Sequence, residues 1–329
     1  MIKIDVKDRK LLYYLSLNSR ESLTRLAKLV GLSKNGVKYR IERLRSLGII
    51  VNFCCLTNLG ACGYKTFIVL IKFNEDIYSN ESILEYFKSH KLIDWAAVLS
   101  GDWDLLIEAV YTERVTDFLD DLIGKFGNKI NKFQVFFSYD IIKVEHLIRD
   151  MYDDLGLEEL PSEQRAYKMM ELDQKDRRIL AQLNSDSTLS YVEMSKRLGL
   201  TIDIIRYRVA QLKKSRVIIK FFPEISLHKL GYISYLFIVR LRNISKERIN
   251  SLKASIRQNR NITYAFFDSI SFSLVCSCAF RSGDEIDQLS RGLRKDYSDI
   301  IDSQSYLVFK DHFIFNLFPK GLLGEKNAK

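Results

Sequence analysis

The sequence is poor in the residues that build disulfide frameworks and metal centres. Its 329 residues include only five cysteines, none in a CxxC pair, and an odd count favours a reducing compartment over disulfide bonding. Cys276 and Cys278 stand two apart in an apolar run, so we expect both side chains on one face of a strand, as small core residues. Histidines are also few and scattered, and we therefore expect no metal site and no cofactor; they are His90, His146, His228 and His312.

Long hydrophobic runs are lacking too. A membrane-spanning helix needs roughly 20 consecutive apolar residues, whereas the longest candidates, such as Phe67–Ile71 and Phe237–Val239, are the size of a strand. The first residues are charged and contain no apolar segment of the kind that secretory signals carry. The sequence therefore predicts a cytoplasmic protein with no membrane partner.

The chain does have an excess of positive charge. It holds 51 Lys and Arg residues against 41 Asp and Glu, a formal net charge of +10. A basic surface attracts nucleic acid or anionic membranes, although a composition rich in lysine gives the same total without any such function. The positions of the charges must decide between these alternatives.

The chain contains an internal repeat. Ile4–Ile50 aligns with Leu172–Ile218 at an offset of 168 without a gap, and 15 of the 47 aligned positions are identical. The offset still holds at Gly63-Tyr64 and Gly231-Tyr232, after which the copies share a pattern more than identities. Self-similarity over this length indicates a duplicated structural unit.

Each copy opens with three predicted helices. Asp5 suits the N-cap of the first, because its side chain can accept a hydrogen bond from an unpaired amide there. Gly48 ends the third helix of the first copy, and the apolar segment Ile49–Leu56 predicts a wing strand. The expected helices are Asp5–Leu17, Ser22–Val30 and Ser33–Leu47, then Asp173–Asn184, Ser190–Leu198 and Thr201–Ser215.

A βαββαβ pattern, typical of a ferredoxin-like domain, follows each group of helices. In the first copy we expect strands at Tyr64–Phe73, Ile93–Leu99, Trp103–Tyr111 and Phe133–Ile142, and helices at Glu81–His90 and Glu113–Phe126. In the second copy we expect strands at Tyr232–Leu241, Ile262–Phe267, Phe272–Phe280 and Ser303–Phe309, and helices at Ser245–Gln258 and Asp284–Tyr297.

These patterns predict an α+β chain of two repeats, each a winged helix-turn-helix followed by a ferredoxin-like domain. We call each winged helix-turn-helix domain a head. The predicted boundaries are 1–58 for the first head, 59–145 for its ferredoxin-like domain, 146–171 for a connector, 172–226 for the second head and 227–329 for its ferredoxin-like domain. The connector is charged and contains Pro161, and we expect it to be helical in part around Val144–Leu155.

The helix–glycine–helix segment is the strongest functional feature. In a helix-turn-helix, a short turn sets two helices at a steep angle, so that the second can enter the major groove of DNA. Gly31 supplies the left-handed turn residue, and Val37 and Leu44 are predicted to face inward. The following helix then carries the candidate DNA-binding residues Ser33, Lys34, Asn35, Lys38, Tyr39, Arg40 and Arg43.

These side-chain types suit a DNA duplex, because Lys and Arg neutralise phosphates and Asn reads an adenine edge. The alternative is a solvated helix flank, where charged residues usually lie. Arg40 and its counterpart Arg208 have another alternative, since each can pair with an aspartate of its own head, Asp8 or Asp176, instead of touching phosphate.

The second helix-turn-helix departs from the first. Its third helix begins Thr201-Ile202-Asp203-Ile204, with an acid and apolar residues where the first copy has Lys34, Asn35 and Gly36. An acidic side chain near phosphates is repulsive. We therefore expect the first head to bind DNA better than the second. The candidate DNA-binding residues of the second head are Arg206, Tyr207 and Arg208.

Several of these motifs together resemble the leucine-responsive regulator (Lrp/AsnC) family of bacteria and archaea: Ile4-Asp5-x-x-Asp8-x-x-Leu11-Leu12, Leu172-Asp173-x-x-Asp176-x-x-Ile179-Leu180, Gly31-Leu32-Ser33, Arg40-Ile41-x-x-Leu44 and Gly48-Ile49-Ile50. The resemblance implies a transcription regulator that binds double-stranded DNA and carries a ferredoxin-like effector domain. It also implies subunits that pair through their effector domains, with amino-acid ligands bound between them. The tandem chain thus resembles a dimer made covalent.

The resemblance extends to a hairpin, because Ser100–Leu106 is similar to the family's Gly-x-x-Asp hairpin near the ligand. It implies Gly101, Asp102 and Asp104 as candidate effector-binding residues. Alternatively, Gly101 only serves a tight turn. In the second copy Ser269–Ser273 replaces the Gly and the Asp, so we expect no pocket of this type there.

Two other functions stay open. Sirohaem decarboxylases resemble the same family, but they would need histidines and arginines to hold the tetrapyrrole carboxylates. The equivalent runs here, Asp94–Glu108 and Thr263–Cys278, contain neither. No nucleophile elbow, P-loop or dinucleotide loop is present either, and we expect no enzyme activity. The other candidate is a module that binds other regulators and not DNA, which the altered second head favours.

Overall fold

The computed structural model describes residues 2–77, 80–111, 114–138, 140–161, 169–243 and 245–323. The chain folds into two compact units that combine the two copies crosswise. Unit 1 contains Met1–Cys54, Tyr139–Arg165 and Lys220–Val308, so the first head shares it with the sheet of the second copy. Unit 2 contains Cys55–Ser138, Ala166–Ile219 and Phe309–Lys329, which joins the second head to the sheet of the first copy.

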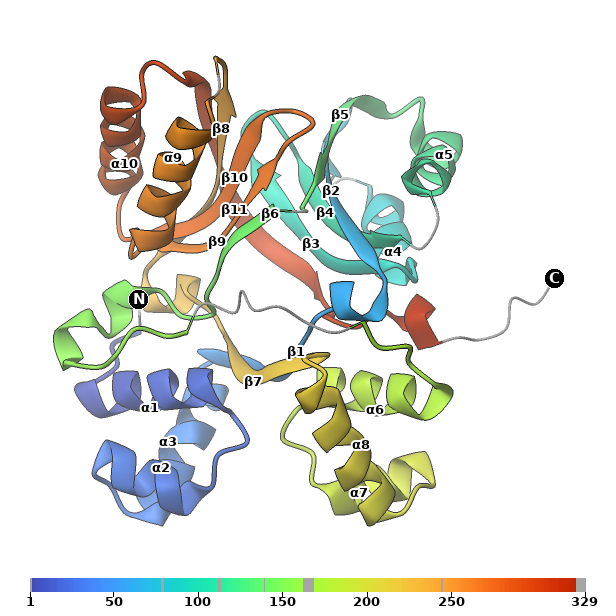
Figure 1. Ribbon diagram of the computed structural model, residues 1–329, viewed down its shortest axis with the longest axis vertical. Coiled ribbons are helices and arrows are strands. Elements are labelled where there is room, and N and C mark those ends of the chain that lie inside the picture. The colour runs from blue at the N-terminus through green and yellow to red at the C-terminus, as the bar shows by residue number, and fades with distance from the viewer. Residues whose placement is uncertain are drawn as a thin grey trace. The chain divides into compact units, whose positions relative to one another are not determined.

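Each head consists of three helices whose starts are fixed by side-chain caps. In unit 1 these are α1 (Val6–Leu17), α2 (Leu23–Val30) and α3 (Lys34–Ser46), and in unit 2 α6 (Gln174–Ser185), α7 (Tyr191–Leu198) and α8 (Ile202–Lys214) (Figure 1). The capping side chains each accept a backbone hydrogen bond from the first turn; they are Asp5, Ser22, Ser33, Asp173, Ser190 and Thr201. All six predicted helices are confirmed to within one residue at each end.

The sheet of unit 2 has the strand order β5-β2-β4-β3, in antiparallel pairs. Its strands are β2 (Lys65–Phe73), β3 (Ile93–Ser100), β4 (Leu105–Tyr111) and β5 (Ile130–Phe137). Two helices cover one face of the sheet and bury Phe87 and Leu122 against it; they are α4 (Glu81–Ser89) and α5 (Val115–Phe126) (Figure 1). The ferredoxin-like order is the predicted one, while Glu113, the expected start of the second helix, lies outside the described residues.

The sheet of unit 1 repeats this order as β11-β8-β10-β9. Its core strands are β8 (Ile233–Leu241), β9 (Ile262–Asp268) and β10 (Ser273–Phe280), joined by the first part of β11 (Ile301–Phe315). Two helices, α9 (Lys246–Gln258) and α10 (Gly283–Asp296), pack their apolar residues on it, so each unit has one hydrophobic layer between helices and sheet.

Each sheet gains a fifth strand from the other copy. The strand β6 (Asp140–Val144) follows β5 in the chain but pairs with β9 of unit 1. In unit 2 the last part of β11 lies beside β3, where the ring centroids of Phe309 and Trp95 are 5.5 Å apart. The prediction of one continuous strand over Phe133–Ile142 was wrong, because β5 ends at Phe137 and β6 joins a different sheet.

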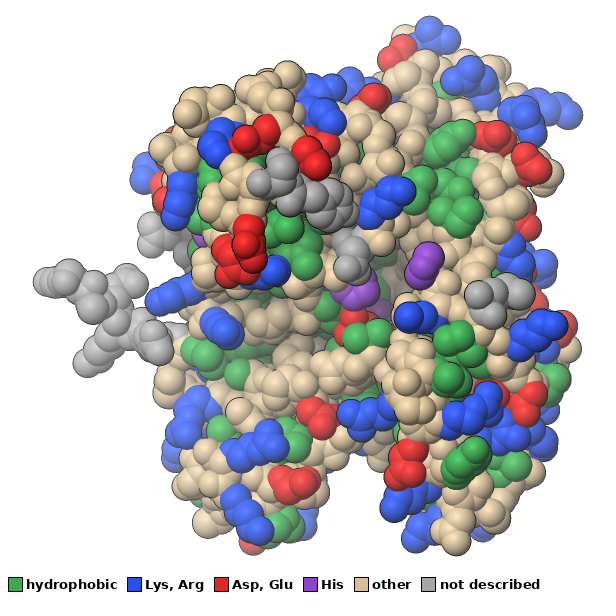
Figure 2. Space-filling view, turned by 180° about the vertical axis from the view of Figure 1, so that it is seen from behind, with side chains coloured by type: hydrophobic (Ala, Val, Ile, Leu, Met, Phe, Trp, Pro, Cys, Tyr) green, Lys and Arg blue, Asp and Glu red, His purple; other side chains and the backbone are tan. Residues whose placement is uncertain are grey.

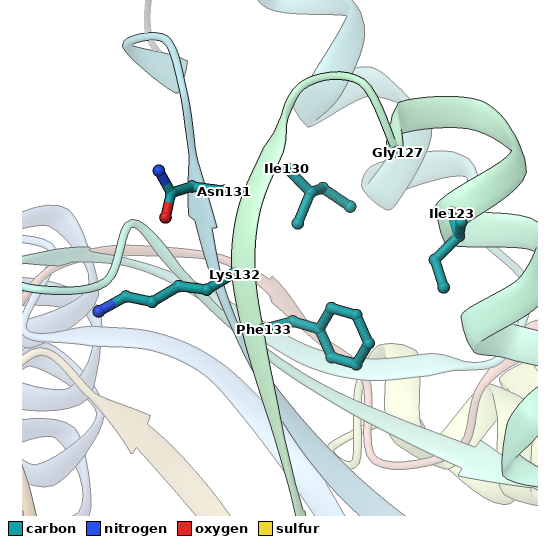
Figure 3. Close-up of a pocket in the computed structure, with 6 residues that line it drawn as sticks. All are labelled: Ile123, Gly127, Ile130, Asn131, Lys132 and Phe133. Carbon is teal, nitrogen blue, oxygen red and sulfur yellow. The ribbon is translucent and has the colours of Figure 1, made fainter.

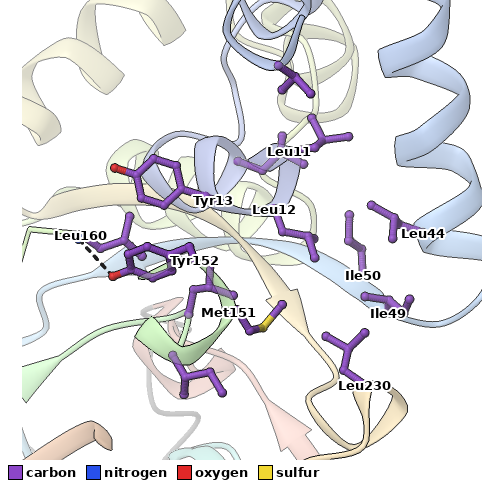
Figure 4. Packing of buried hydrophobic residues seen from close by; sticks show 14 of the residues in the cluster. Leu11, Leu12, Tyr13, Leu44, Ile49, Ile50, Met151, Tyr152, Leu160 and Leu230 are labelled. Carbon is purple, nitrogen blue, oxygen red and sulfur yellow. Dashed lines mark hydrogen bonds between the residues drawn. The ribbon is translucent and has the colours of Figure 1, made fainter. Parts of the chain in front are cut away.

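The segment after each exchanged strand attaches a head to its sheet. In unit 1, Leu147, Met151, Tyr152 and Leu160 are buried in one cluster with α1 and α3, and the Leu160 amide donates to the Tyr152 hydroxyl at 3.2 Å (Figure 4). In unit 2, Arg177 of α6 donates to the carbonyl of Leu322 at 2.7 Å. The expected partial helix in the connector consists of two short 3-10 turns, Arg149–Met151 and Asp153–Leu155, and its residues 162–168 lie outside the described part of the chain.

The expected wing strand is present as β1 (Ile50–Thr57), and its counterpart is β7 (Ile218–Ile225). The two strands pair with each other as a separate two-stranded sheet. In unit 1 the Ser226 amide donates to the Ile49 carbonyl at 2.9 Å, and in unit 2 the Asn58 amide donates to the Val217 carbonyl at 2.8 Å. The strand that follows each head is therefore held by the equivalent strand of the other copy.

Candidate nucleic-acid interface

The turn between α2 and α3 has the geometry of a helix-turn-helix. Gly31 ends α2 in the left-handed conformation, with φ 69° and ψ 52°, which glycine adopts without steric cost. The Leu32 amide returns to the Ala27 carbonyl at 2.9 Å. Ser33 then caps α3, its hydroxyl accepting from the Gly36 amide at 3.1 Å. The turn therefore fixes where α3 begins and which of its faces is outward.

One face of α3 is buried and the opposite face is exposed. Val37 and Leu44 have no exposed surface. The exposed side chains include five of the predicted DNA-binding residues, and the Tyr39 side chain is among the most accessible, with the residue 65% exposed. The first turn of α3 carries no acidic residue. The structure brings these five together on one surface: Ser33, Lys34, Asn35, Lys38 and Tyr39.

Arg40 and Arg43 point back into the head. Arg40 donates to both carboxylate oxygens of Asp5, at 2.9 and 2.8 Å, and to Asp8 at 2.7 Å, while Arg43 reaches Asp8 at 3.4 Å. Asp8 is fully buried. Of the two roles considered for Arg40, the structure shows the ion pair, which ties α3 to the start of α1.

These contacts shift the pKa values of the charged groups. The hydrogen bonds to Asp8 and then Asp5 raise the pKa of Arg40. Partial burial opposes ionisation of Asp5, but the Asp8 amide and the Arg40 guanidinium outweigh it and hold the pKa of Asp5 below its usual value. Both side chains are thus charged at neutral pH, as an ion pair requires.

The second head has the same arginine–aspartate ion pairs as the first but a different exposed surface. Arg208 donates to Asp173 at 2.8 and 2.7 Å and to Asp176 at 2.9 Å, so it too serves its own head. Arg206 and Tyr207 are exposed, and Arg206 pairs with Asp203 at 3.0 Å. The basic charge offered by α8 is therefore partly neutralised within its own first turns.

Further basic residues surround α3. Arg25 and Lys28 of α2 and Arg45 of α3 are exposed on the same head. Figure 2 shows Lys and Arg side chains on this head, which lies at lower right in that view. Lys38 pairs with Glu42 at 3.8 Å, but both side chains are 65% exposed, and such a surface pair contributes little energy and releases its lysine readily. The head offers a basic surface to a polyanion.

The capping hydroxyls give a first prediction. Replacing Ser33 or Thr201 by Ala removes the acceptor for the Gly36 or Ile204 amide, and we expect each change to lower the free energy of unfolding of its unit by about 1 kcal/mol. Both Trp residues, Trp95 and Trp103, lie in unit 2. Urea unfolding followed by Trp fluorescence should therefore respond to Thr201→Ala but not to Ser33→Ala, whereas far-UV circular dichroism should respond to both.

The matched control is Ser282→Ala, because Ser282 occupies the N-cap of α10 without making a side-chain cap hydrogen bond. We expect its unfolding curve to match that of the unmodified chain. A loss as large as that of Ser33→Ala would contradict the capping explanation.

The candidate effector hairpin lies between β3 and β4. Gly101 and Asp102 are exposed, and Gly101 has a positive φ of 128°. The Asp104 carboxylate is bound to the neighbouring strand β2, because it accepts hydrogen bonds from Lys72 Nζ at 2.7 Å and from the Phe73 amide at 2.8 Å. Asp104 therefore fixes the hairpin to β2, and of the three candidate residues Gly101 and Asp102 are the exposed ones.

A shallow apolar pocket lies elsewhere in unit 2, between α5 and β5. Figure 3 shows Ile123, Ile130 and Phe133 pointing into it, whereas Asn131 and Lys132 point away. The hairpin residues do not line this pocket. Within the described ranges, no group of three or more His, Cys, Asp or Glu side chains is placed to hold a metal ion.

The structure also shows a pair of acids that sequence reasoning missed, of which Asp94 is buried and Glu108 half-buried. Asp94 and Glu108 lie on the neighbouring strands β3 and β4, and Oδ1 of Asp94 has no hydrogen-bond partner among the described residues. Burial raises the pKa of Glu108, and burial together with Glu108 raises that of Asp94. The available clue was an acid within each of two apolar strand sequences, near the start of β3 and in the middle of β4.

Glu108→Gln should therefore stabilise unit 2 in a pH-dependent way. A carboxyl whose pKa is raised by folding stabilises the protein below its unfolded pKa, 4.5 for Glu, and this contribution is lost as pH rises towards the folded pKa. Each unit of pKa is worth about 1.4 kcal/mol, so we expect the variant to gain about 1–3 kcal/mol at pH 8 and little at pH 5. Trp fluorescence during urea unfolding measures the free energy of unfolding at each of the two pH values.

Glu85→Gln is the control, because Glu85 is an exposed acid of α4 in the same unit. Its effect should be small at both pH values. Equal stabilisation by Glu108→Gln at pH 5 and pH 8 would show that the buried charge is not the cause.

The chain is similar to known proteins in sequence and in fold. The AsnC-type helix-turn-helix domain matches residues 4–45 and 172–213. An uncharacterized HTH-type transcriptional regulator of Pyrococcus horikoshii is 35% identical over 135 residues, which cover 40% of this chain and 86% of the relative. One of Pyrococcus furiosus is 28% identical over 156 residues, 45% of this chain and all of the relative. The solved structure of the siroheme decarboxylase NirDL matches 96% of this chain and 97% of its own with a TM-score of 0.64 and 14% identity, which is a likeness of fold alone.

The fold and the two capped heads define an α+β protein with duplicated helix-turn-helix domains and ferredoxin-like sheets. The chain belongs to the Lrp/AsnC family of helix-turn-helix regulators. Its regulator relatives correspond to less than half of it, as expected for a chain that contains two copies of their unit. Among the helices of the described residues, none is long and apolar enough to cross a membrane.

Proposed function

We propose that this chain is a cytoplasmic transcription regulator that binds double-stranded DNA through the outward faces of α3 and α8, as a covalent pseudo-dimer. The observation that carries the proposal is the exposed face of α3, where Lys34, Asn35, Lys38 and Tyr39 project from a helix-turn-helix of the AsnC type. In this motif the N-terminal residues of the recognition helix meet the base edges.

Each exposed residue has a distinct role in the proposal. Lys34 and Lys38 contact phosphates, Asn35 contacts a base edge, and Ser33 fixes the start of α3. Arg206 and Tyr207 make the corresponding contacts from α8. The arginines Arg40, Arg43 and Arg208 act as positioning residues, because they hold each recognition helix to the first helix of its own head.

Fluorescence anisotropy with a labelled random-sequence duplex at several salt concentrations tests the proposal. Every phosphate contact releases counterions, so the logarithm of the affinity should fall linearly with the logarithm of salt, with a slope of about −0.9 per contact. Failure to bind any duplex at about 50 mM salt would overturn the proposal and favour a module that binds other regulators.

We also propose that the chain self-associates through its ferredoxin-like domains and binds an amino acid near Gly101 and Asp102. Support comes from the resemblance of the hairpin to that of the family and from the exposure of these two residues. A ligand present at 100 times its Kd stabilises the folded state by about 2.7 kcal/mol. Thermal melts with each amino acid should find one that raises the melting temperature, and Asp102→Ala should abolish the shift; no shift with any of them contradicts an amino-acid effector.

An enzyme related to sirohaem decarboxylases is the second candidate, favoured by the likeness of fold over 96% of the chain. The residues argue against it. The His90 ring packs on Phe118, and the His146 ring stacks on Phe222 with centroids 3.8 Å apart. Burial lowers the pKa of both histidines. Titration with sirohaem decides the matter: a shift of its absorption bands supports the enzyme, and an unchanged spectrum excludes it.

A further inference from the structure

The two recognition helices agree along most of their length. Tyr39 and Tyr207 occupy equivalent positions and are each 65% exposed. One basic position is kept as well, occupied by Lys38 in α3 and Arg206 in α8, both exposed. The two helices therefore offer a duplex the same aromatic and basic contacts from their middle turns.

They differ at the N-terminal tip, which we define as Lys34-Asn35-Gly36 in α3 and Ile202-Asp203-Ile204 in α8. All three positions change in chemical type. Both tips begin after a capping hydroxyl, of Ser33 or of Thr201, that accepts from the third position at 3.1 or 3.3 Å. The backbone is thus held in the same way in both heads, and the difference lies in the side chains.

The tip of α3 carries hydrogen-bonding groups suited to purines. Lys34 and Asn35 are exposed. In the major groove Asn pairs with N6 and N7 of the purine adenine, so Asn35 is the base-reading residue of this tip, while Lys34 is left to the phosphate contact proposed above. Gly36 leaves room beside them, and a Cβ at this position would come within 3.2 Å of the Ser33 hydroxyl.

The tip of α8 carries groups suited to pyrimidines. Ile204 is 36% exposed and Ile202 half-buried, so both present methyl groups at the helix end. Apolar side chains contact the methyl group of thymine, and Asp accepts from N4 of cytosine. The Asp203 side chain is 88% exposed, and Arg206 lies 3.0 Å from it. The arginine offsets the repulsion between this acid and nearby phosphates.

We infer that the chain recognises a DNA site with two unlike halves, in which α3 reads purine edges and α8 reads thymine methyl and cytosine amino groups on the strand that each tip faces. The inference rests on the proposed DNA binding and adds to it the sequence class of the target. Two copies of the same tip would favour two like halves, whereas this chain carries one tip of each kind.

Selection from a library of randomised duplexes tests the inference. The unmodified chain should enrich a motif with two different halves. The triple variant Ile202→Lys/Asp203→Asn/Ile204→Gly gives α8 the tip of α3, and it should enrich two copies of one half, in either relative orientation. On a duplex with two such copies, the variant should bind about tenfold tighter than the unmodified chain.

Two results would overturn the inference: enrichment of two like halves by the unmodified chain, or the same motif for the chain and the triple variant. A chain that retains no duplex at low salt fails at the earlier step, and the proposed DNA binding falls together with the inference. These outcomes are distinguishable, because the first two require measurable binding.

Two single substitutions keep the test open if the triple variant loses its cooperative Trp-fluorescence transition. Asn35→Ala should relax the preference for adenine at one position, and Asp203→Asn the preference for cytosine at another, each by about tenfold. The two relaxed positions should fall in different halves of the motif. Relaxation in the same half, or in neither, would overturn the inference.

Discussion

Replacing Lys34 and Lys38 together by Ala is expected to weaken binding to any duplex by about tenfold to a hundredfold at moderate salt. Both lysines are exposed on the outward face of α3, and neither is buried in an internal ion pair. Each lost phosphate contact should also reduce the slope of log affinity against log salt by about 1, so the double variant should lose about 2. Anisotropy titrations at four salt concentrations measure both quantities.

The matched control is Lys88→Ala/Lys125→Ala, which removes two exposed lysines from α4 and α5 and leaves both heads unchanged. If binding followed the net charge of +10 alone, the two double variants would lose equal affinity. Arg206→Ala in α8 should cost less than the loss of either lysine from α3, because Asp203 already neutralises part of its charge. Equal losses from the two heads would contradict the expected inequality between them.

Asp8→Ala is expected to lower the free energy of unfolding of unit 1 by about 3 kcal/mol. The carboxylate is fully buried, accepts from Arg40 at 2.7 Å and Arg43 at 3.4 Å, and also receives the Asp5 amide at 3.2 Å. Removing it leaves Arg43 without its carboxylate and the first turn of α1 without half of its capping box. Breaking a buried ion pair in this way is costly, because the remaining charge stays desolvated.

Far-UV circular dichroism during urea unfolding should report this loss, while the Trp fluorescence of unit 2 should not change. Asp154→Ala is the control, since its pair with Arg9 is exposed on the aspartate side and a solvent-exposed ion pair contributes little to stability. An effect of Asp8→Ala no larger than that of Asp154→Ala would refute the assigned role.

Acid should weaken the arginine–aspartate ion pairs of both heads. The folded pKa values of Asp5 and Asp173 lie below the unfolded value of 3.8, so their stabilisation is fully present above pH 4 and is lost as the pH falls through the folded values.

The heads could be predicted from the sequence because their determinants are local. Asp5, Ser33 and Gly31 each act on residues within one turn of themselves, through a cap or a left-handed backbone. The exposed face of α3 followed from the same reasoning, since helical periodicity places Val37 and Leu44 on the opposite side. These are the features that fixed the candidate interface.

Two features lay beyond sequence reasoning because they depend on contacts between distant residues. The partner of Arg40 was left open, since Asp8 lies 32 residues away and only the crossing of α1 and α3 brings them together. The exchange of strands was not predicted, because the sequence between Phe133 and Ile142 contains no glycine or proline to mark the end of β5 at Phe137. Hydrogen bonds to β9, more than 100 residues later, decide where it goes.

Because each unit combines segments from both copies, the order of synthesis on the ribosome limits when each unit can fold. The first 54 residues are made early, yet the strands that complete their unit emerge only as synthesis approaches residue 308. Until then the apolar cluster around Leu11 and Leu12 lacks its last members, Leu230, Tyr232 and Ala279. Slow, late closure of this kind favours chaperone assistance, and it means that a chain truncated before residue 308 would contain neither unit complete.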